Sequence, residues 1–430
     1  MRRGLAVMLG VILLAVLLAL PAVVPAPPAP GGGQTAPAVT GAPGATAAPT
    51  ATQAPARVEE AAAHVLPYRA VWVSYLEWQE VDFSSADAFT ADIAPMLDNM
   101  AALGANVVLA QVRPFGDALY PSAYYPFSHL CTGTQGQDPG FDPLALLITA
   151  AAARGLEVEA WVNPYRLQAG GTPAVLDAQS PANLHPDWVK STDSGLFLDP
   201  ANPEVRQYIA DAVGELCANY AIAGVHFDDY FYPTTAEDFD ADEYAAYQSA
   251  AGAPLPLADW RRQNVDALIT LCWQTVHGFD GLRFGVAPQG DIALNYDAQY
   301  SDAALWLAEG GYVDYLCPQL YWGLDYTKDG SGSHALGALS AAWAALPRAE
   351  GVHLYFGLGA YRIGEGDGGD LTGPGTEWQR GDALAGQLAA LRALPGGCEG
   401  LALYRYANLF ANALYPTLAG QETDALKTAW

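Results

Sequence analysis

The feature that most constrains the fold of this chain is a repeated alternation between short strand-like runs and longer helical stretches. Eight runs rich in β-branched and aromatic residues are separated by amphipathic segments, a pattern that predicts βα units and a parallel sheet. The runs cover 70–75, 106–112, 157–163, 224–230, 283–288, 315–322, 353–361 and 400–406. Eight such units predict a closed (β/α)8 TIM barrel, which is an α/β fold.

The stretches between the runs carry helix signals. Apolar residues recur on one face at helical spacing, as at Phe89, Ile93 and Leu103. A second helix is expected to begin at Asn202, because Asn is a favoured N-cap and the Pro203 that follows it suits the first helical position. Both signals agree with helices that pack an apolar face on a sheet.

The connections that leave the strands are much longer than those that return to them. Long connections cover 114–143, 165–203, 231–258 and 362–381, whereas 103–105 and 154–156 are short. Long loops at the carboxyl ends of barrel strands are where such folds hold their functional sites. The competing architecture is an open doubly wound sheet, but residues 73–78 lack the glycine-rich phosphate turn that this sheet would carry.

The first 65 residues are not expected to belong to the barrel. Two arginines precede an apolar run over residues 5–20, which predicts a signal peptide or an uncleaved signal anchor over residues 1–24. Residues 25–65 are rich in Pro, Ala, Thr and Gly, a composition that predicts a disordered linker because it buries too little apolar surface. The barrel then covers 66–430. We expect an exported monomer, extracellular or in the cell envelope, with a membrane tether if the signal is retained.

The charge of the chain constrains its partners. It has 46 acidic and 19 basic residues, a formal net charge of −27, so it should repel the phosphates of nucleic acids. A polysaccharide is a more suitable partner, and 11 Trp and 23 Tyr supply rings for stacking on sugars, although rings also fill ordinary cores. The five cysteines are scattered without a metal-binding spacing, and we expect buried thiols.

Two adjacent carboxylates end the fourth run. Side chains of a barrel strand alternate between the interior and the helix layer, and Val225 and Phe227 suit the helix layer. That parity places His226 and Asp228 toward the interior, with Asp228 at the mouth and Asp229 at the start of the loop. Desolvation and mutual repulsion would separate the two pKa values, and glycoside hydrolysis needs one ionised and one protonated carboxylate. The structural alternatives are a calcium site or an Asp that caps a helix or turn.

The ends of the other runs supply candidates for the wall of the site. By parity Gln111 and Arg113 both face inward, and Arg113 would orient a carboxylate, contact a sugar acid or form a structural salt bridge. Asn163 at the end of the third run is a suitable donor to a sugar hydroxyl. The further substrate-binding candidates are Glu77, Asp117, Tyr165, Arg166, Gln319, Tyr321 and Trp322.

Two further titratable residues, Glu159 and His226, are expected deeper in the barrel than Asp228. By the same parity Glu159 is level with His226 on the neighbouring strand. The two would form a buried structural ion pair, or Glu159 would tune Asp228 through His226. Glu77 is the alternative carboxylate partner of Asp228, and the loop acids Asp291, Asp325 and Glu365 are not ranked by the sequence.

Several other chemistries lack their motifs. The chain has no HExxH, no GxSxG, no phosphate-binding P-loop and no Cys/His cluster. We therefore expect no metal and no cofactor. Two rivals to a glycosidase stay open: a glycan-binding barrel without catalysis, tethered to the wall, and a metal-dependent deacetylase or esterase in which His226 and the Asp pair would be ligands.

Seven blocks resemble the glycosyl-hydrolase-like family 10 proteins. In order they are RAVWVSYLEW, NVVLAQVRPFGDALYPSAYYPFS, AWVNPYR, FLDPANPEVRQYI, GVHFDDYFYP, FGVAPQG and YLCPQLYWG. The resemblance extends from Arg69 to Tyr406 and implies a TIM-barrel glycosidase of the bacterial cell envelope that acts on peptidoglycan glycan strands, including strands stripped of stem peptides. It implies Asp228 and Asp229 as the acidic pair. The Gly/Asp-rich stretch 364–370 departs from the family pattern.

Overall fold

A computed structural model of the chain describes residues 67–228, 230–373 and 375–430. The predicted signal segment (1–24), the whole predicted linker (25–65) and the first residue of the predicted barrel domain, Leu66, lie outside these residues, and so does Asp229. No helix in the described ranges is both long enough and apolar enough to cross a membrane.

All eight predicted runs form parallel strands, in order. The strands are β1 (Tyr68–Val73), β2 (Val107–Arg113), β3 (Glu157–Val162), β7 (Gly224–Phe227), β8 (Arg283–Val286), β9 with β10 (Tyr315–Leu316, Gln319–Leu320), β11 with β12 (His353–Leu354, Phe356–Gly359) and β13 (Gly400–Tyr404). The sixth and seventh runs are each divided into two short strands.

The strands close into a ring. From β1 the pairing passes through β2, β3, β7 and β8 to β9, while on the other side β1 pairs with β13 and β13 pairs with β12. Because β9 pairs with β11 and β10 pairs with β12, the sixth and seventh runs join and complete the circle. The prediction of a (β/α)8 barrel is therefore confirmed.

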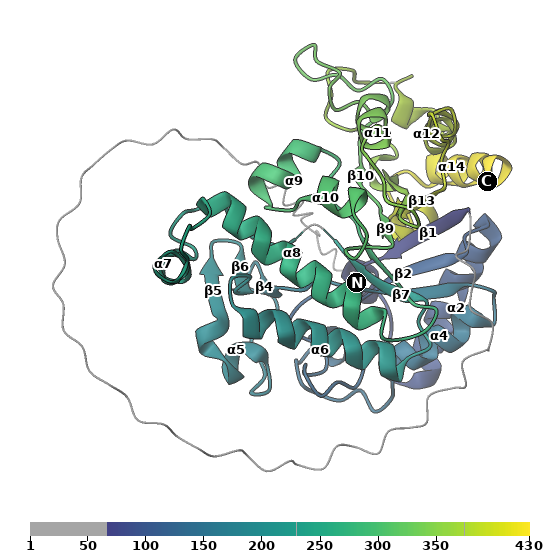
Figure 1. The fold of residues 1–430 in the computed structure, drawn as a ribbon. Coiled ribbons are helices and arrows are strands. Elements are labelled where there is room, and N and C mark those ends of the chain that lie inside the picture. Colours follow the sequence, from purple (N-terminus) through teal and green to yellow (C-terminus); the bar gives the residue numbers. More distant parts are fainter. Residues whose placement is uncertain (1–66, 229, 374) are drawn as a thin grey trace, which may run out of the picture. The chain divides into compact units, whose positions relative to one another are not determined.

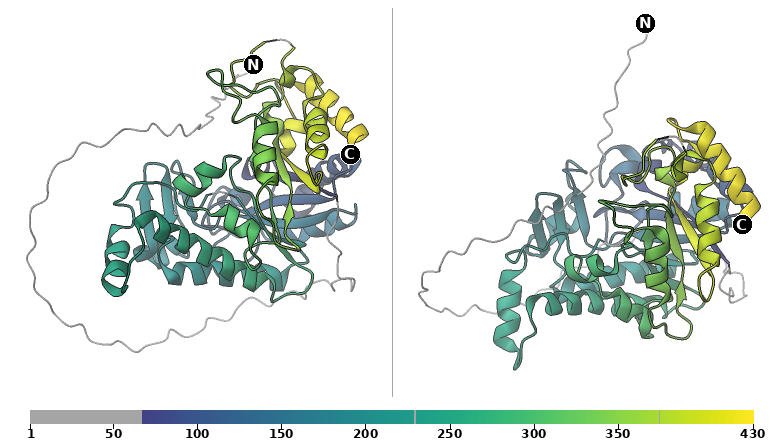
Figure 2. Two further views of the ribbon diagram at one scale, coloured as in Figure 1. Left: turned by 45° about the horizontal axis from the view of Figure 1, so that its top comes forward. Right: turned by 90° about the horizontal axis from the view of Figure 1, so that it is seen from above.

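Eight helices follow the eight strand runs and pack outside them (Figures 1 and 2). They are α2 (Ala86–Leu103), α4 (Pro143–Ala152), α6 (Pro203–Asn219), α8 (Leu257–Val276), α10 (Ala303–Ala308), α11 (Leu336–Ala344), α12 (Ala383–Arg392) and α14 (Pro416–Ala429). The predicted apolar face of α2 is buried, including Phe89, Ile93 and Leu103. As predicted, α6 begins after Asn202, whose side chain accepts the N–H of Glu204 at 2.8 Å.

The long loops contain additional elements. The loop after β3 holds a three-stranded antiparallel sheet that the sequence analysis described only as a long connection; its strands are β4 (Arg166–Ala169), β5 (Val189–Thr192) and β6 (Gly195–Leu198). The short helices are α1 (Tyr75–Trp78), α3 (His129–Thr132), α5 (Pro181–Leu184), α7 (Ala241–Ala250), α9 (Ile292–Ala298) and α13 (Tyr406–Phe410), with 3-10 turns η1 (Pro186–Trp188), η2 (Ala360–Arg362) and η3 (Glu377–Gln379).

The barrel interior is a small core of its own. Trp72, Trp161 and Tyr315 are among its large side chains, and Gly285 leaves room for Tyr315, because a Cβ at Gly285 would lie 2.0 Å from the Tyr315 ring. A second and larger core lies between strands and helices and contains Val225 and Phe227, as their parity predicted. Four of the five cysteines (Cys131, Cys217, Cys272 and Cys317) are buried, as predicted, whereas Cys398 is only partly buried.

The expected ion pair between Glu159 and His226 is wrong. Glu159 instead accepts a hydrogen bond from Arg283 at 2.6 Å, and the Tyr315 hydroxyl lies between it and His226, bonded to both. Burial lowers the pKa of His226 to about 4 despite the nearby Glu159 charge, so the imidazole is neutral at pH 7. Sequence parity placed both side chains on the interior face, but the predicted common level is wrong, because His226 lies opposite Trp161 and Glu159 lies opposite Gly224. The sequence also could not identify Arg283 as the cation.

Candidate active site

Asp228 lies where parity placed it, at the carboxyl end of β7. Its side chain is 5% exposed. Asn163 Nδ2 donates to both carboxylate oxygens, at 2.7 and 2.6 Å, and the Trp161 indole N–H donates at 3.2 Å. Both neighbours belong to the end of the third strand run. A carboxylate that accepts hydrogen bonds at both oxygens is held in one orientation at the barrel mouth, as a catalytic group requires.

Asn163 is oriented by two further donors. Gln111 Nε2 donates to Asn163 Oδ1 at 2.5 Å, and Arg166 Nη2 donates to the same oxygen at 3.0 Å. Because the amide oxygen faces these donors, the amide nitrogen must face Asp228. Gln111 is itself fixed by the backbone N–H of Tyr75, at 2.7 Å. The structure therefore brings four predicted residues, Gln111, Asn163, Arg166 and Asp228, into one network.

Aromatic rings line the barrel beside Asp228. Trp161 lies edge-on to Tyr404 with centroids 6.4 Å apart, and Tyr404 stacks with Tyr321 at 5.6 Å. Tyr361 meets both tyrosines edge-on. Rings next to a carboxylate supply the apolar faces on which a sugar can stack. Tyr321 was predicted, whereas Tyr404 and Tyr361 were missed, although Tyr404 shares the parity of the interior residue Ala402.

Arg113 is not in this network, and its predicted inward parity is wrong. The pairing of β2 with β3 shifts register between Gln111 and Arg113, a bulge that turns Arg113 to the helix side. There its guanidinium lies 4.3 Å from the centre of the Tyr125 ring and donates to the Pro164 carbonyl. A regular two-residue period cannot reveal a bulge.

Three other candidates have structural hydrogen bonds or are packed in the core. Glu77 completes the capping box of α1 with Ser74 and also pairs with Arg405, at the end of the neighbouring strand β13. Tyr165 is fully buried, and burial raises the pKa of its hydroxyl far above the usual range. Asp117 accepts hydrogen bonds from His129 and Gln135 and so shapes the loop after β2.

Gln319 and Trp322 follow the sixth strand run. Gln319 Nε2 donates to the Ala287 carbonyl at 2.8 Å, which ties β10 to the loop after β8. Trp322 packs beside His334, with ring centres 5.5 Å apart, and a Cβ at Gly290 would approach its ring to 3.1 Å. Both residues lie at the carboxyl end of the sixth strand run, next to Tyr321.

The Gly/Asp-rich stretch from Gly364 to Asp370 joins two loops of the mouth. Carboxylates of the loop after β12 accept backbone N–H groups of the loop after β10. The pairs are Asp367 with Gly323 (2.9 Å), Glu377 with Leu324 (2.5 Å), and Asp370 with Asp329 (3.0 Å) and Gly330 (2.9 Å). Burial and the neighbouring Asp325 carboxyl raise the pKa of Glu377 to about 7. These hydrogen bonds join the two loops and fix the loop beyond Tyr321.

Metal binding finds little support in the described part of the chain. No group of three His, Cys, Asp or Glu side chains within it is arranged to hold a metal ion. Both ring nitrogens of His226 already have partners, since Nε2 lies 3.2 Å from the Trp72 indole nitrogen and Nδ1 lies 2.8 Å from the Tyr315 hydroxyl. His226 is therefore not available as the ligand that a metal-dependent esterase would need.

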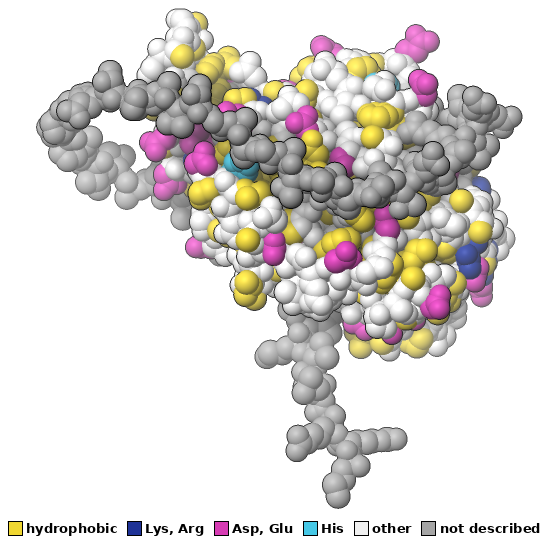
Figure 3. Space-filling model, turned by 90° about the horizontal axis from the view of Figure 1, so that it is seen from below, with side chains coloured by type: hydrophobic (Ala, Val, Ile, Leu, Met, Phe, Trp, Pro, Cys, Tyr) yellow, Lys and Arg dark blue, Asp and Glu magenta, His cyan; other side chains and the backbone are white. Residues whose placement is uncertain are grey.

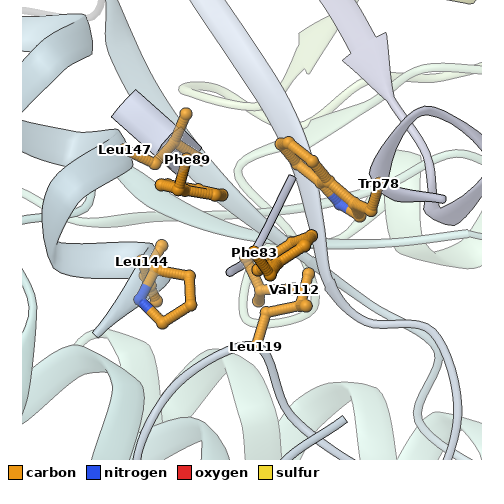
Figure 4. A pocket seen from close by; sticks show the side chains of 8 residues that line it. Trp78, Phe83, Phe89, Val112, Leu119, Leu144 and Leu147 are labelled. Carbon is orange, nitrogen blue, oxygen red and sulfur yellow. The ribbon is translucent and has the colours of Figure 1, made fainter. Parts of the chain in front are cut away.

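A separate hollow lies outside the barrel, between α2, α4 and the loop after β2 (Figure 4). Its lining is apolar and includes Trp78, Phe89 and Leu144. The space open to the centre of a water-sized sphere is about 10 Å³, which holds at most one water molecule. This hollow is a packing defect of the outer core and has no room for a sugar.

The surface agrees with the charge of the sequence. On the face shown in Figure 3, acidic side chains are scattered widely and basic ones are few. Such a surface is unfavourable for polyanions, except where a cation is placed at the site itself.

A closed parallel barrel with a buried carboxylate and aromatic rings at the carboxyl ends of its strands is the architecture of many glycoside hydrolases. Residues 67–370 match the family described as "Glycosyl hydrolase-like 10", and the chain belongs to that family.

Named relatives support this assignment. The chain is 35% identical over 316 residues to "Glycosyl hydrolase YngK" of Bacillus subtilis (strain 168), covering 69% of this chain and 61% of the relative. It is 34% identical over 333 residues to "Glycosyl hydrolase DigH" of Escherichia coli (strain K12), covering 70% and 74%. The chain therefore matches somewhat under two thirds of YngK and about three quarters of DigH.

Solved structures share the fold at low sequence identity. The glycoside hydrolase domain of PgaB (BpsB) from Bordetella bronchiseptica has a TM-score of 0.54 at 16% identity, covering 84% of this chain and 98% of that one. Alpha-L-fucosidase isoenzyme 2 from Paenibacillus thiaminolyticus has a TM-score of 0.54 at 14% identity, covering 84% and 49%. These likenesses show the barrel fold.

Proposed function

We propose that this protein hydrolyses O-glycosidic bonds in a cell-envelope polysaccharide, and that the polysaccharide is the glycan strand of peptidoglycan. The observation that carries the proposal is the buried Asp228 carboxylate at the barrel mouth, oriented by Asn163 and Trp161 beside an aromatic wall. Membership of a family named for glycosyl hydrolases supports the reaction. The choice of peptidoglycan rests on the resemblance of the motif blocks and on the predicted export signal.

In this proposal Asp228 is the ionised carboxylate of the pair. The Trp161 indole and the Asn163 amide both donate N–H groups to its oxygens, which suits a nucleophile or a group that stabilises an oxocarbenium-like transition state. The Asn163 amide, fixed by Gln111 and Arg166, holds the carboxylate while charge develops on the sugar.

Asp229 is the proposed acid/base, because it follows Asp228 directly at the start of the loop. Glu77 suits that role less well, since Ser74, Arg405 and the Ala407 N–H already occupy its oxygens. Carboxyl groups about 5–5.5 Å apart would retain the anomeric configuration, and a separation of about 6.5–9.5 Å would invert it.

The proposal is tested by incubating the full chain with amidase-stripped peptidoglycan strands, with intact peptidoglycan and with chitin oligosaccharides. New reducing ends and the masses of the products are measured. Release from stripped strands supports the proposal. Saturable binding of the same strands by folded protein, without new reducing ends, would instead identify a glycan-binding barrel.

A further inference from the structure

One cation lies within the network around Asp228. Arg166 begins β4, directly beyond the third strand run, and its Nη2 donates to the same amide whose nitrogen contacts Asp228. One side chain, that of Asn163, therefore separates the guanidinium from the carboxylate. A group at this distance is within reach of the sugar that Asp228 attacks or of its direct neighbour.

The guanidinium of Arg166 is held in place. Its Nε donates to the Pro114 carbonyl at 2.7 Å, and its central carbon lies 5.1 Å from the centre of the Phe115 ring and 5.6 Å from that of Tyr230. Tyr230 is 53% exposed, so one of the two rings faces solvent at the mouth. A guanidinium already fixed between rings loses little conformational freedom when it pairs with a ligand.

Arg166 differs in its partners from several other arginines of the chain. Arg261, Arg283 and Arg405, for example, form salt bridges with carboxylates. Within the described residues, no salt bridge joins Arg166 to a carboxylate, and the guanidinium donates its hydrogen bonds from Nε and Nη2. Arg166 is only partly buried, and no described residue accepts a hydrogen bond from its Nη1, which leaves this group for an anionic ligand.

We propose that Arg166 selects glycans whose sugars carry carboxylates, by pairing its guanidinium with a substrate carboxylate beside the sugar held at Asp228. This inference rests on the proposed function and names the chemical class of the substrate. Stripped peptidoglycan strands belong to that class, because each muramic acid bears a lactyl carboxylate once its peptide is removed. In an acidic protein a single fixed guanidinium overcomes, at one point, the repulsion that the rest of the surface exerts on an anion.

The competing role for Arg166 is positioning alone, through its hydrogen bond to Asn163. The two roles differ in what they do to a neutral ligand. Loss of a positioning residue weakens charged and neutral ligands alike, whereas loss of a carboxylate partner weakens only the charged one. The test therefore compares two forms of one glycan, the stripped strands and the same strands with every carboxylate coupled to methylamine to give a neutral amide.

Binding is measured with the full chain carrying Asp228→Asn, so that the glycan stays intact. Arg166→Gln should raise the Kd for carboxylated strands about 10- to 100-fold, the range expected for a lost charge-assisted hydrogen bond, and that for amidated strands less than about threefold. Arg166→Lys, which keeps the charge, should lie between. Lys328→Gln removes an equal charge from an exposed position in the loop after β10 and should change either Kd less than about threefold.

Equal weakening of both strand forms by Arg166→Gln would overturn the inference and leave Arg166 as a positioning residue. Absence of binding to either form would overturn it as well. Hyaluronan oligosaccharides, whose carboxylates belong to uronic acids, form a third arm that shows which kind of carboxylate is preferred. If carboxylated strands bind through Arg166 but the protein with Asp228 intact releases no reducing ends, the inference stands and the proposed hydrolysis fails.

Discussion

The polar cluster inside the barrel allows a quantitative test of how the fold is held. Arg283 begins β8 and is almost fully buried; it donates to Glu159 at 2.6 Å and to Glu157 at 2.7 Å. Glu159 is fully buried and also accepts from the hydroxyls of Tyr68 and Tyr315. Replacing Arg283 with Met keeps most of the side-chain volume and leaves the Glu159 carboxylate buried without its cation.

The expected cost follows from that burial. Removing one partner of a buried ion pair costs about 3–5 kcal/mol, because the remaining charge is uncompensated. Since the penalty belongs to the charge on Glu159, adding Glu159→Gln to Arg283→Met should return about 2 kcal/mol or more.

The free energy of unfolding is measured by urea denaturation of wild type, both single variants and the double variant, followed by fluorescence and by circular dichroism. Agreement of the two probes establishes that one transition is observed. The reasoning that the buried pair of Arg283 and Glu159 stabilises the barrel would be refuted by either of two results. One is a loss of unfolding free energy below about 1 kcal/mol for Arg283→Met, and the other is purely additive effects in the double variant.

Three further predictions concern the site and the outer layer. Asn163→Ala should lower kcat about 10- to 100-fold while the unfolding midpoint changes little, because Asp228 loses its amide donor; steady-state kinetics and thermal unfolding check this. Burial raises the pKa of Asp266 to about 7, so its stabilising contribution is present below about pH 4 and is lost as the pH rises through 7. Asp266→Asn, which can still accept from the Trp306 indole, should flatten the fall of the melting temperature between pH 5 and 8; an unchanged slope would contradict the assignment. EDTA should lower glycan hydrolysis less than about twofold, and a full loss that zinc or calcium restores would favour a metal-dependent mechanism.

The fold was predictable from sequence because each strand and helix carries its own local signal. The eight runs, the Asn202 cap and the alternation that places Asp228 at the mouth all depend on residues adjacent in the chain. Those signals are local propensity and two-residue or 3.6-residue periodicity, which a single sequence displays directly.

The parts that escaped prediction depend on contacts between distant segments. The bulge that turns Arg113 outward is a register shift between β2 and β3, which no pattern within β2 records. The partner of Glu159 is Arg283, on a strand far along the chain, and Tyr404 joins the site only because the last strand closes on the first. The antiparallel sheet after β3 was missed because its strands are short and partly exposed.

The central claim is that Asp228 is the catalytic carboxylate of a glycosidase. The most direct test compares reducing-end release from stripped glycan strands by wild type, Asp228→Asn and the matched control Asp138→Asn, an exposed carboxylate in the loop after β2. The account predicts at least a hundredfold loss for Asp228→Asn, about 2.7 kcal/mol of transition-state stabilisation, with an unchanged rate for the control. Release by Asp228→Asn within about threefold of wild type would contradict it.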